Sequence, residues 1–338
     1  MGCSAMPSFK LRRCDRCYKF HASYTLDDPQ RGRKIYLCYD CWSAENRGLQ
    51  LGTPTIDIRS VLANLPKKVS KLDLQTLLAH LLGQPRAWVL AHPEAALTDE
   101  QRRALEAAVG CLRRGVPLPY VLERWEFFGL EFIVTPDVLI PRPETELLVE
   151  TALSWMRQPG SAIRNCIDIG TGSGCIAVSL AVNAPCLAVN APSPALTATD
   201  ISPAAIAVAH ANAEKHSVAD RIEFHTSDLF ETAALEGRRF DLLAANLPYI
   251  PSWTLRQLEV YDHEPALALD GGADGLALIR RLLQTAPPHI AAGGGLLLEI
   301  EASQGNSALA LARSAFPQAD TRLLHDLAGH DRLLTIQT

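Results

Sequence analysis

The chain of 338 residues contains no apolar run that approaches the roughly 18 residues needed to cross a bilayer. Its first six residues lack both the apolar core of a signal peptide and the Ser/Thr at position six of a myristoylation site. Excess positive charge is also absent, because the formal net charge is -5. This balance argues against a general affinity for nucleic acid or acidic lipid. Together these absences predict a cytoplasmic protein with no membrane partner.

What the chain does contain is typical of a folded protein. Hydrophobic residues make up 48% and charged residues 20% of the sequence, a balance seen in soluble globular proteins. The length is sufficient for two or three domains, each with its own core. Charge is uneven, since residues 1–50 hold nine Lys/Arg against five Asp/Glu. The remainder of the chain is therefore acidic.

Four of the nine cysteines form two Cys-x-x-Cys pairs with 20 residues between them. They are Cys14, Cys17, Cys38 and Cys41. In a cytoplasmic chain this spacing favours a structural zinc site over disulfides. Residues 1–50 have few large aliphatic side chains, so such a segment needs a cross-link to fold. We therefore predict a zinc-ribbon-like module over residues 1–50, with a redox dithiol or unrelated reduced thiols as alternatives.

A helical domain is predicted over residues 55–118, after a linker from Gly48 to Pro54 that shows no periodicity. Leucines at helical spacing from Leu74 to Leu82 predict a helix that stops at Gly83. A capping-box signature at Thr98 predicts the start of a second helix, which ends at Gly115. These helices carry no chemistry of their own, and we expect them to recognise the substrate or to pack against a catalytic domain.

Residues 119–140 are predicted to form a hairpin linker. Apolar positions alternate from Trp125 to Val134 around a central glycine, which favours a hairpin or a bent strand.

The next segment begins with two prolines, Pro141 and Pro143, which favour extended backbone. Glu144 and Glu146 favour the N-terminal turn of a helix that continues to Trp155. This segment opens the predicted catalytic domain.

Residues 141–338 are predicted to form an α/β domain. From Asn165 onward strand and helix patterns alternate, which predicts a largely parallel, doubly wound Rossmann-like sheet. The expected strands lie near residues 165–169, 196–200, 221–225, 240–245, 294–300 and 331–336.

The first of these strands runs into a glycine-rich turn, Gly170-Thr171-Gly172-Ser173-Gly174, two residues after Asp168. The dinucleotide fingerprint requires glycine at its first, third and sixth positions, but the sixth position here is Cys175. The carboxylate of Asp168 suits a ligand that bears an amine better than it suits a pyrophosphate. S-adenosylmethionine is such a ligand, because its amino group and its sulfonium are both cationic.

Further polar residues follow the next strands. Asp200 ends the second strand, where a carboxylate can accept both hydroxyls of a ribose. Asp228 follows the third strand and is expected to meet an adenine amine, with Leu229 or Phe230 against the adenine face. The arrangement therefore predicts a bound S-adenosyl cofactor at the carboxyl ends of successive strands.

After the fourth strand comes Asn246-Leu247-Pro248-Tyr249. Ligands of open α/β sheets bind outside the carboxyl ends of the strands, so this loop lies where a ligand is expected. An amide, a backbone carbonyl, a proline and an aromatic ring in a row suit a planar group that bears nitrogen. Taken alone, the four residues favour an ordinary turn over a ligand site.

At this point the sequence resembles the release factor glutamine N5-methyltransferases, the HemK/PrmC proteins, over roughly residues 70–338. The motifs that carry the resemblance are Pro117 to Phe132, Leu139 to Glu146, the glycine turn, Asp200 to Ser202, Asn246 to Ile250, Glu264 to Leu267, Gly271 to Leu276 and Asp326 to Arg332.

The resemblance implies methyl transfer from S-adenosylmethionine to the glutamine side-chain amide of the Gly-Gly-Gln motif in peptide chain release factors. It implies cofactor contacts from the glycine turn, Asp200, Leu229 and Asn246. It also implies that Asn246, Leu247, Pro248 and Tyr249 hold the glutamine amide. Arg142 is a candidate for the glutamine pocket, with a capping role as the alternative.

Two features depart from the family pattern. The family normally has Asn-Pro-Pro-Tyr where this chain has leucine at 247, and residues 1–50 are not a usual part of it. Asn-Leu-Pro-Tyr also resembles the motif of ribosomal RNA adenine dimethyltransferases. An adenine N6-methyltransferase therefore stays an alternative, although the acidic catalytic part argues against nucleic acid. A methyltransferase fold without activity, acting as a binding module, is a second alternative.

Overall fold

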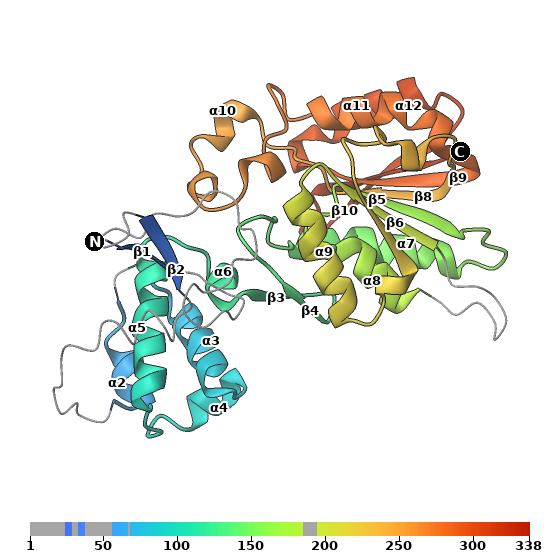
Figure 1. Cartoon of the computed structure of the whole chain (residues 1–338). Helices are drawn as coiled ribbons and strands as arrows, with labels where there is room; N and C mark the ends of the chain where they lie inside the picture. The colour runs from blue at the N-terminus through green and yellow to red at the C-terminus, as the bar shows by residue number, and fades with distance from the viewer. Residues whose placement is uncertain (1–23, 29–32, 38–55, 67, 185–194) are drawn as a thin grey trace. The chain divides into compact units, whose positions relative to one another are not determined.

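The computed structural model describes residues 24–28, 33–37, 56–66, 68–184 and 195–338 (Figure 1). The chain divides into two compact units, Met1–Leu122 and Glu123–Thr338. All four cysteines of the predicted zinc module lie outside the described residues. Within the described residues, no group of three or more His, Cys, Asp or Glu side chains is placed to hold a metal ion.

The described residues of the first unit form one antiparallel strand pair and five helices. Its elements are β1 (Tyr24–Asp28), β2 (Arg33–Leu37), α2 (Ile58–Ala63), α3 (Lys71–Leu82), α4 (Arg86–Ala91), α5 (Asp99–Arg113) and α6 (Leu118–Leu122). Gly83 caps the C-terminus of α3, and Thr98 and Gln101 form the capping box of α5, which confirms both predicted helix boundaries. Leucines of α3 are buried at the centre of the helical core.

The second unit is an α/β domain. Its strands are β3 (Arg124–Phe127), β4 (Leu130–Ile133), β5 (Asn165–Ile169), β6 (Ala195–Asp200), β7 (Ile222–Thr226), β8 (Phe240–Ala245), β9 (Ile290–Glu299), β10 (Asp320–His325) and β11 (Asp331–Gln337). Its α-helices are α7 (Glu146–Arg157), α8 (Cys175–Asn183), α9 (Pro203–Lys215), α10 (Ser252–Leu255), α11 (Ala277–Thr285) and α12 (Gly305–Ala315), and a 3-10 turn, η1 (Pro143–Thr145), precedes α7.

Seven of these strands form one sheet in the order β10-β11-β9-β8-β5-β6-β7. The pairs from β9 through β8, β5 and β6 to β7 are parallel, and β11 is antiparallel to both β9 and β10. The predicted parallel, doubly wound sheet is therefore confirmed.

Two strands of the sheet, β9 and β10, differ from the sequence-based prediction. Strand β9 begins at Ile290, four residues before the predicted start, because a run of glycines at 293–295 hides the strand pattern. Gly295 lies inside the strand because the indole of Trp155 occupies the space where a side chain would project. Strand β10 was not predicted, since none of its residues is fully buried and its pattern lacks an apolar run.

Helices cover both faces of the sheet. Figure 1 shows α11 and α12 on one face and α7, α8 and α9 on the other. Alternate residues of β5 point to opposite cores, with Ile167 and Ile169 packed on the α11 side and Cys166 on the α8 side. This alternation follows from the two-residue period of a strand and buries β5 on both faces.

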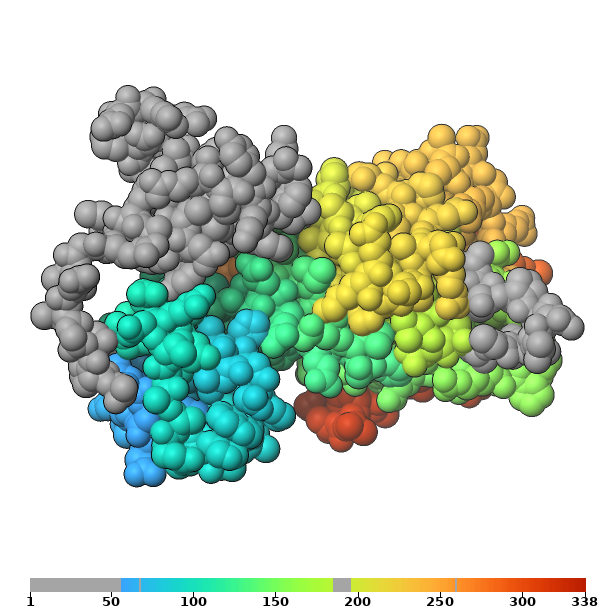
Figure 2. All heavy atoms as spheres, turned by 60° about the horizontal axis from the view of Figure 1, so that its bottom comes forward, coloured from blue at the N-terminus to red at the C-terminus, as the bar shows by residue number. Residues whose placement is uncertain are grey.

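The β3–β4 hairpin packs against the helices of the second unit. Asn212 of α9 accepts a hydrogen bond from the Ile133 amide at 2.7 Å and donates one to the Ile133 carbonyl at 2.9 Å. The carboxylate of Glu146 accepts a hydrogen bond from the Phe128 amide at 2.9 Å. The segment predicted as a linker is thus bonded to α9 and α7. Figure 2 shows α9, in yellow, at the surface of this unit.

None of the helices in the described part of the chain combines the length and the apolar character that a membrane span requires.

Candidate active site

The predicted site residues converge on one edge of the sheet. Strand β5 pairs in parallel with β6 on one side and with β8 on the other, so the strand order reverses at β5. In open α/β sheets this reversal point opens a crevice at the carboxyl ends of the strands. Asp168, Asp200, Asp228 and Asn246 lie at or directly after the carboxyl ends of β5, β6, β7 and β8.

The glycine turn, Gly170 to Gly174, is fastened to β6 through its backbone. The amides of Gly170 and Thr171 donate to the Thr199 carbonyl at 2.8 and 2.9 Å. The amide of Gly172 donates to Oδ2 of Asp200 at 2.9 Å. Gly172 has a φ of +55°, and a side chain at this position would meet no atom within 4 Å. At Gly172 the turn therefore presents bare backbone to open space, as a close-fitting ligand requires.

Asp168 is completely buried beneath this turn. Its Oδ2 accepts hydrogen bonds from the Thr171 hydroxyl at 2.6 Å and the Ala177 amide at 3.2 Å. Its Oδ1 has no hydrogen-bond partner in the described part of the chain. Burial raises the pKa of Asp168 to about 7, against the lowering effect of the two hydrogen bonds. A cationic ligand would offset that penalty, so the unpaired oxygen fits the ammonium of an S-adenosyl cofactor.

Asp200 is held in place by two backbone amides. Its Oδ1 accepts from the Ser202 amide and its Oδ2 from the Gly172 amide, each at 2.9 Å. Burial raises the pKa of Asp200, whereas these amides lower it. Each carboxylate oxygen can accept a second hydrogen bond. The side chain therefore fits a pair of ribose hydroxyls.

Asp228 has a partner that the sequence did not reveal. Its Oδ2 pairs with Nη2 of Arg281, from α11, at 3.0 Å. Oδ1 is the oxygen left for an adenine amine. The neighbouring Leu229 has a φ of +53° and is 7% exposed, so its side chain belongs mainly to the core.

The side chains of Thr171 and Ser173 are also buried. Thr171 uses its hydroxyl on Asp168, and Ser173 projects into the protein. In this turn the half-buried Gly170 and Gly172 are the more accessible residues.

The Asn246 side chain is oriented by a residue far away in the sequence. Its Nδ2 donates to Oγ1 of Thr145 at 2.9 Å. Thr145 is 1% exposed and precedes the first residue of α7, but its hydroxyl caps no helix amide. With Nδ2 engaged, Oδ1 of Asn246 is the atom available to accept a ligand hydrogen bond. Sequence reasoning missed Thr145, although its proline-rich segment had been singled out.

The remainder of the loop from Asn246 to Tyr249 is packed tightly. Leu247 is 5% exposed, and its Cδ2 lies 3.0 Å from the point where a side chain at Gly170 would begin. Gln304 donates through Nε2 to the Tyr249 carbonyl at 2.9 Å. A side chain at Gly275 would begin 2.3 Å from that same carbonyl, so only glycine permits this approach.

Glu299 lies under the loop at the carboxyl end of β9. It is 1% exposed, and its Oε1 accepts a hydrogen bond from the Tyr249 hydroxyl at 3.2 Å. Burial raises the pKa of Glu299 to about 7, while Thr145, Tyr249 and Arg332 lower it. The same burial, with Glu299 nearby, raises the pKa of the Tyr249 hydroxyl. Sequence reasoning missed Glu299, although a carboxylate that ends an apolar strand is a usable signal.

Arg142 is paired within the unit. Its Nη2 lies 2.6 Å from Oε1 of the buried Glu264, whose Oε2 accepts from the Ile140 amide at 3.2 Å. The guanidinium of Arg142 therefore connects two of the family motifs, Leu139 to Glu146 and Glu264 to Leu267. Neither a glutamine-pocket role nor a helix-capping role is needed to explain its position.

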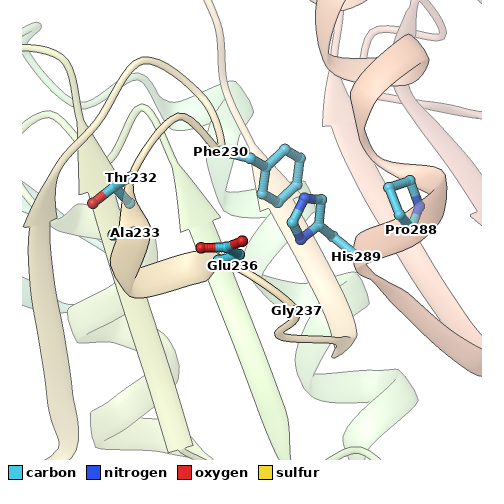
Figure 3. Close-up of a pocket in the computed structure, with 7 residues that line it drawn as sticks. All are labelled: Phe230, Thr232, Ala233, Glu236, Gly237, Pro288 and His289. Atoms are coloured by element: carbon cyan, nitrogen blue, oxygen red, sulfur yellow. The ribbon is translucent and has the colours of Figure 1, made fainter.

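A separate open pocket of about 560 Å³ lies away from these residues (Figure 3). Phe230 and His289 stack in parallel in its wall, with ring centroids 4.1 Å apart. Gly237 and His289, which line it, precede the first residues of β8 and β9. One side of this pocket therefore lies near the amino ends of β8 and β9. Its lining includes Phe230, the alternative candidate for the adenine face, whose ring is stacked on His289 here.

Comparisons with known proteins agree with this architecture. The PrmC N-terminal domain family matches residues 57–122, and a methyltransferase domain family matches residues 162–284. The release factor glutamine methyltransferase of Geobacter sulfurreducens is 38% identical over 279 residues, which cover 82% of this chain and 92% of the relative. That of Bordetella pertussis is 42% identical over 272 residues, covering 78% and 93%.

Among solved structures, a protein-(glutamine-N5) methyltransferase, described as release factor-specific, from Alicyclobacillus acidocaldarius is 32% identical. The match has a TM-score of 0.37 and covers 61% of this chain and 98% of that chain.

Proposed function

Because the chain belongs to the release factor glutamine methyltransferase family, we propose that it methylates the side-chain amide of a glutamine in peptide chain release factors. The methyl donor is S-adenosylmethionine, and the target is the glutamine of the Gly-Gly-Gln motif. The observation that carries the proposal is the orientation of Asn246 at the reversal point of the sheet. Its nitrogen is engaged by Thr145, so its oxygen is free to accept an amide hydrogen.

S-adenosylmethionine, when bound, supplies an electrophilic methyl group. The residues that would hold it are Asp168 for the ammonium, the glycine turn for close backbone contact, and Asp200 for the ribose. The buried, unpaired oxygen of Asp168 supports this fit, as does the open space at Gly172. Asp228 and Leu229 would border the adenine.

The loop from Asn246 to Tyr249 would activate the glutamine amide by holding it. An amide nitrogen is a poor nucleophile, because its lone pair is delocalised into the carbonyl. Oδ1 of Asn246 accepts one N–H and the Leu247 carbonyl accepts the other, which orients the nitrogen for in-line attack on the methyl group. As the nitrogen gains positive charge, these fixed acceptors stabilise the transition state. Tyr249 packs on the flat amide, and positioning supplies most of the rate.

No strong base is required in this scheme. The methylated amide nitrogen is positively charged before it loses its proton, and in that state it is acidic enough to release the proton to water. Leu247 takes part through its backbone carbonyl, so a leucine can replace the proline that the family normally has there.

The helical part of the first unit, which matches the PrmC N-terminal domain, would recognise the release factor. The predicted zinc module over residues 1–50 would be a fused addition to the family's usual domains.

Mass spectrometry of a release factor incubated with the enzyme and S-adenosylmethionine tests the proposal. We expect one added methyl group on the Gly-Gly-Gln glutamine and none on a release factor in which that glutamine is asparagine. A structured RNA incubated in parallel tests the adenine alternative, which the leucine at 247 favours. Methylation of the RNA and not of the release factor would reverse the assignment.

A further inference from the structure

The mechanism proposed above does not use the carboxyl group of Glu299. This side chain is 1% exposed and projects from the end of β9 toward the loop that carries Asn246 and Tyr249. Its Oε1 accepts the Tyr249 hydroxyl, but Oε2 has no hydrogen-bond partner in the described part of the chain. Burying a carboxyl group with an unpaired oxygen costs free energy of folding, so its presence here calls for a functional explanation.

Thr145 connects this carboxyl to Asn246. The Thr145 oxygen accepts the Nδ2 hydrogen of Asn246, so the hydroxyl proton must point elsewhere. The hydroxyl also interacts with Glu299, whose pKa it lowers. An ionised carboxylate only accepts hydrogen bonds. The free proton of Thr145 can therefore turn toward the carboxylate, which has one oxygen without a partner, so that donation would run from Asn246 through Thr145 to Glu299.

The direction of hydrogen-bond donation decides whether the oxygen or the nitrogen of the Asn246 amide faces a ligand. A half-turn of the amide group exchanges its oxygen and nitrogen with little change in shape. If Glu299 carried a proton and donated it to Thr145, the Thr145 proton would point at Asn246. The Asn246 oxygen would then turn inward, and its N–H groups would face the N–H groups of the glutamine.

We propose that Glu299 is a positioning residue: its ionised carboxylate, acting through Thr145, holds the Asn246 amide with its oxygen toward the substrate glutamine. The inference rests on the proposed function of the Asn246 loop. It adds one requirement for methyl transfer: the carboxyl group of Glu299, beneath the loop, must be ionised.

Several charged or titratable groups face Glu299 from the surrounding elements. Arg332 of β11 favours the ionised carboxylate, and Glu144 of η1 opposes it. Arg332 also pairs with Asp326 at 3.2 Å, which limits its effect. Tyr249 donates to the carboxyl, and Cys175, at the start of α8, has its own pKa raised partly by Glu299. With a pKa of about 7, Glu299 changes charge near neutral pH.

Turnover measured against pH tests the inference, with full-length enzyme, a release factor and saturating S-adenosylmethionine. For the wild-type enzyme we expect kcat to rise up to about tenfold per pH unit below 7 and to level off above it. Glu299→Gln keeps the shape but can donate a hydrogen bond, as the protonated acid does. We expect its kcat to be at least about tenfold lower above pH 7 and to lose the rise with pH.

Two variants of Thr145 distinguish an effect on the orientation of the Asn246 amide from a general effect on folding. Thr145→Val removes the hydroxyl and should reproduce the loss in kcat, whereas Thr145→Ser retains the hydroxyl and should restore turnover to near the wild-type value. S-adenosylhomocysteine should bind all three variants within about threefold of wild type, because the cofactor residues are untouched.

The outcomes are distinguishable. A wild-type enzyme that methylates the release factor, together with a Glu299→Gln variant of unchanged kcat and pH profile, overturns this inference alone. A wild-type enzyme that methylates no release factor overturns the proposed function and this inference with it. A Thr145→Val variant with wild-type turnover overturns the link through Thr145.

Discussion

The glycine turn and the loop from Asn246 to Tyr249 follow neighbouring strands at the same edge of the sheet, yet they are held differently. The turn is fastened by Asp168 beneath it and by Thr199 and Asp200 at the end of the adjacent strand. Two of these contacts are backbone hydrogen bonds to Thr199, and the others use carboxylates at the ends of β5 and β6. All of them come from the two neighbouring strands that the turn connects to.

The loop instead depends on side chains from three distant segments. Thr145 holds Asn246 from 101 positions away, and Glu299 and Gln304 hold Tyr249 from 50 and 55 positions away. The backbone at Ile250 also exchanges hydrogen bonds with the segment at 269–271. The cofactor half of the site is thus built locally and the substrate half by long-range packing. Substitutions in the cofactor half should therefore change mainly cofactor affinity, and substitutions in the substrate half should change mainly turnover.

Asn246→Ala is expected to give the largest difference between the effect on methyl transfer and the effect on cofactor binding. The variant removes the acceptor for the glutamine amide but leaves the glycine turn intact. We expect methyl transfer to fall by at least about a hundredfold, in line with the loss of one oriented transition-state hydrogen bond. Calorimetry with S-adenosylhomocysteine should give a dissociation constant within a few-fold of wild type. Turnover near the wild-type rate in this variant would contradict the amide-clamp scheme.

Gly275→Ala tests whether long-range packing shapes the loop. The added methyl group would begin 2.3 Å from the Tyr249 carbonyl and 2.5 Å from Nε2 of Gln304. We expect a loss of about 1–3 kcal/mol in the free energy of unfolding and a fall in kcat. Urea denaturation and single-turnover assays measure the two effects.

Gly237→Ala is the matched control. Gly237 has a φ of +68°, similar to the +75° of Gly275, but a side chain there would meet no atom within 4 Å. It should therefore show only the backbone cost of about 1 kcal/mol and keep its kcat. Equal loss of kcat in both variants would mean that contact with the loop is not the cause.

Asp168→Asn probes the cofactor half through pH. The native pKa of Asp168, about 7, lies above its ordinary value of 3.8, so the native state binds the proton more tightly than the unfolded chain. Ionisation of Asp168 therefore destabilises the ligand-free protein progressively as pH rises from about 4 to 7.

We expect the asparagine variant to be about 1–3 kcal/mol more stable than wild type at pH 8, with the difference lost near pH 4. Affinity for S-adenosylmethionine should fall by about tenfold, because the charge that meets the ammonium is gone. Thermal unfolding across this pH range and calorimetry measure the two effects. A variant that is less stable at pH 8 than at pH 4, relative to wild type, would reverse the assigned sign.

The smallest effect is expected for Leu247→Pro. The residue contributes its carbonyl to the amide clamp, and its side chain packs in the core beside Gly170. Proline is apolar and somewhat smaller, so turnover should stay within about threefold of wild type. Complete loss of methyl transfer would show that this loop differs from that of the family.

Most secondary structure was predictable because its signals are local. The capping box at Thr98 and the glycine that ends α3 define helix ends through contacts within four residues. Strand β10 escaped prediction because it is an edge strand with half-exposed residues. The hairpin at 124–133 was expected, but its attachment to Asn212 depends on a helix 79 positions later.

The sequence by itself determined where the polar residues of the site stand along the chain. Asp168, Asp200, Asp228 and Asn246 each follow a buried run, and the parallel sheet brings the ends of such runs to one edge. Local periodicity and turn chemistry suffice for that, because they act over a few residues.

Only the tertiary structure decided which atoms of those residues are free. Arg281 takes one oxygen of Asp228, Thr145 takes the nitrogen of Asn246, and Glu299 is buried beneath Tyr249. These partners come from helices and strands far away in the chain. Their hydrogen bonds and desolvation arise only when the layers pack, so no local pattern encodes them.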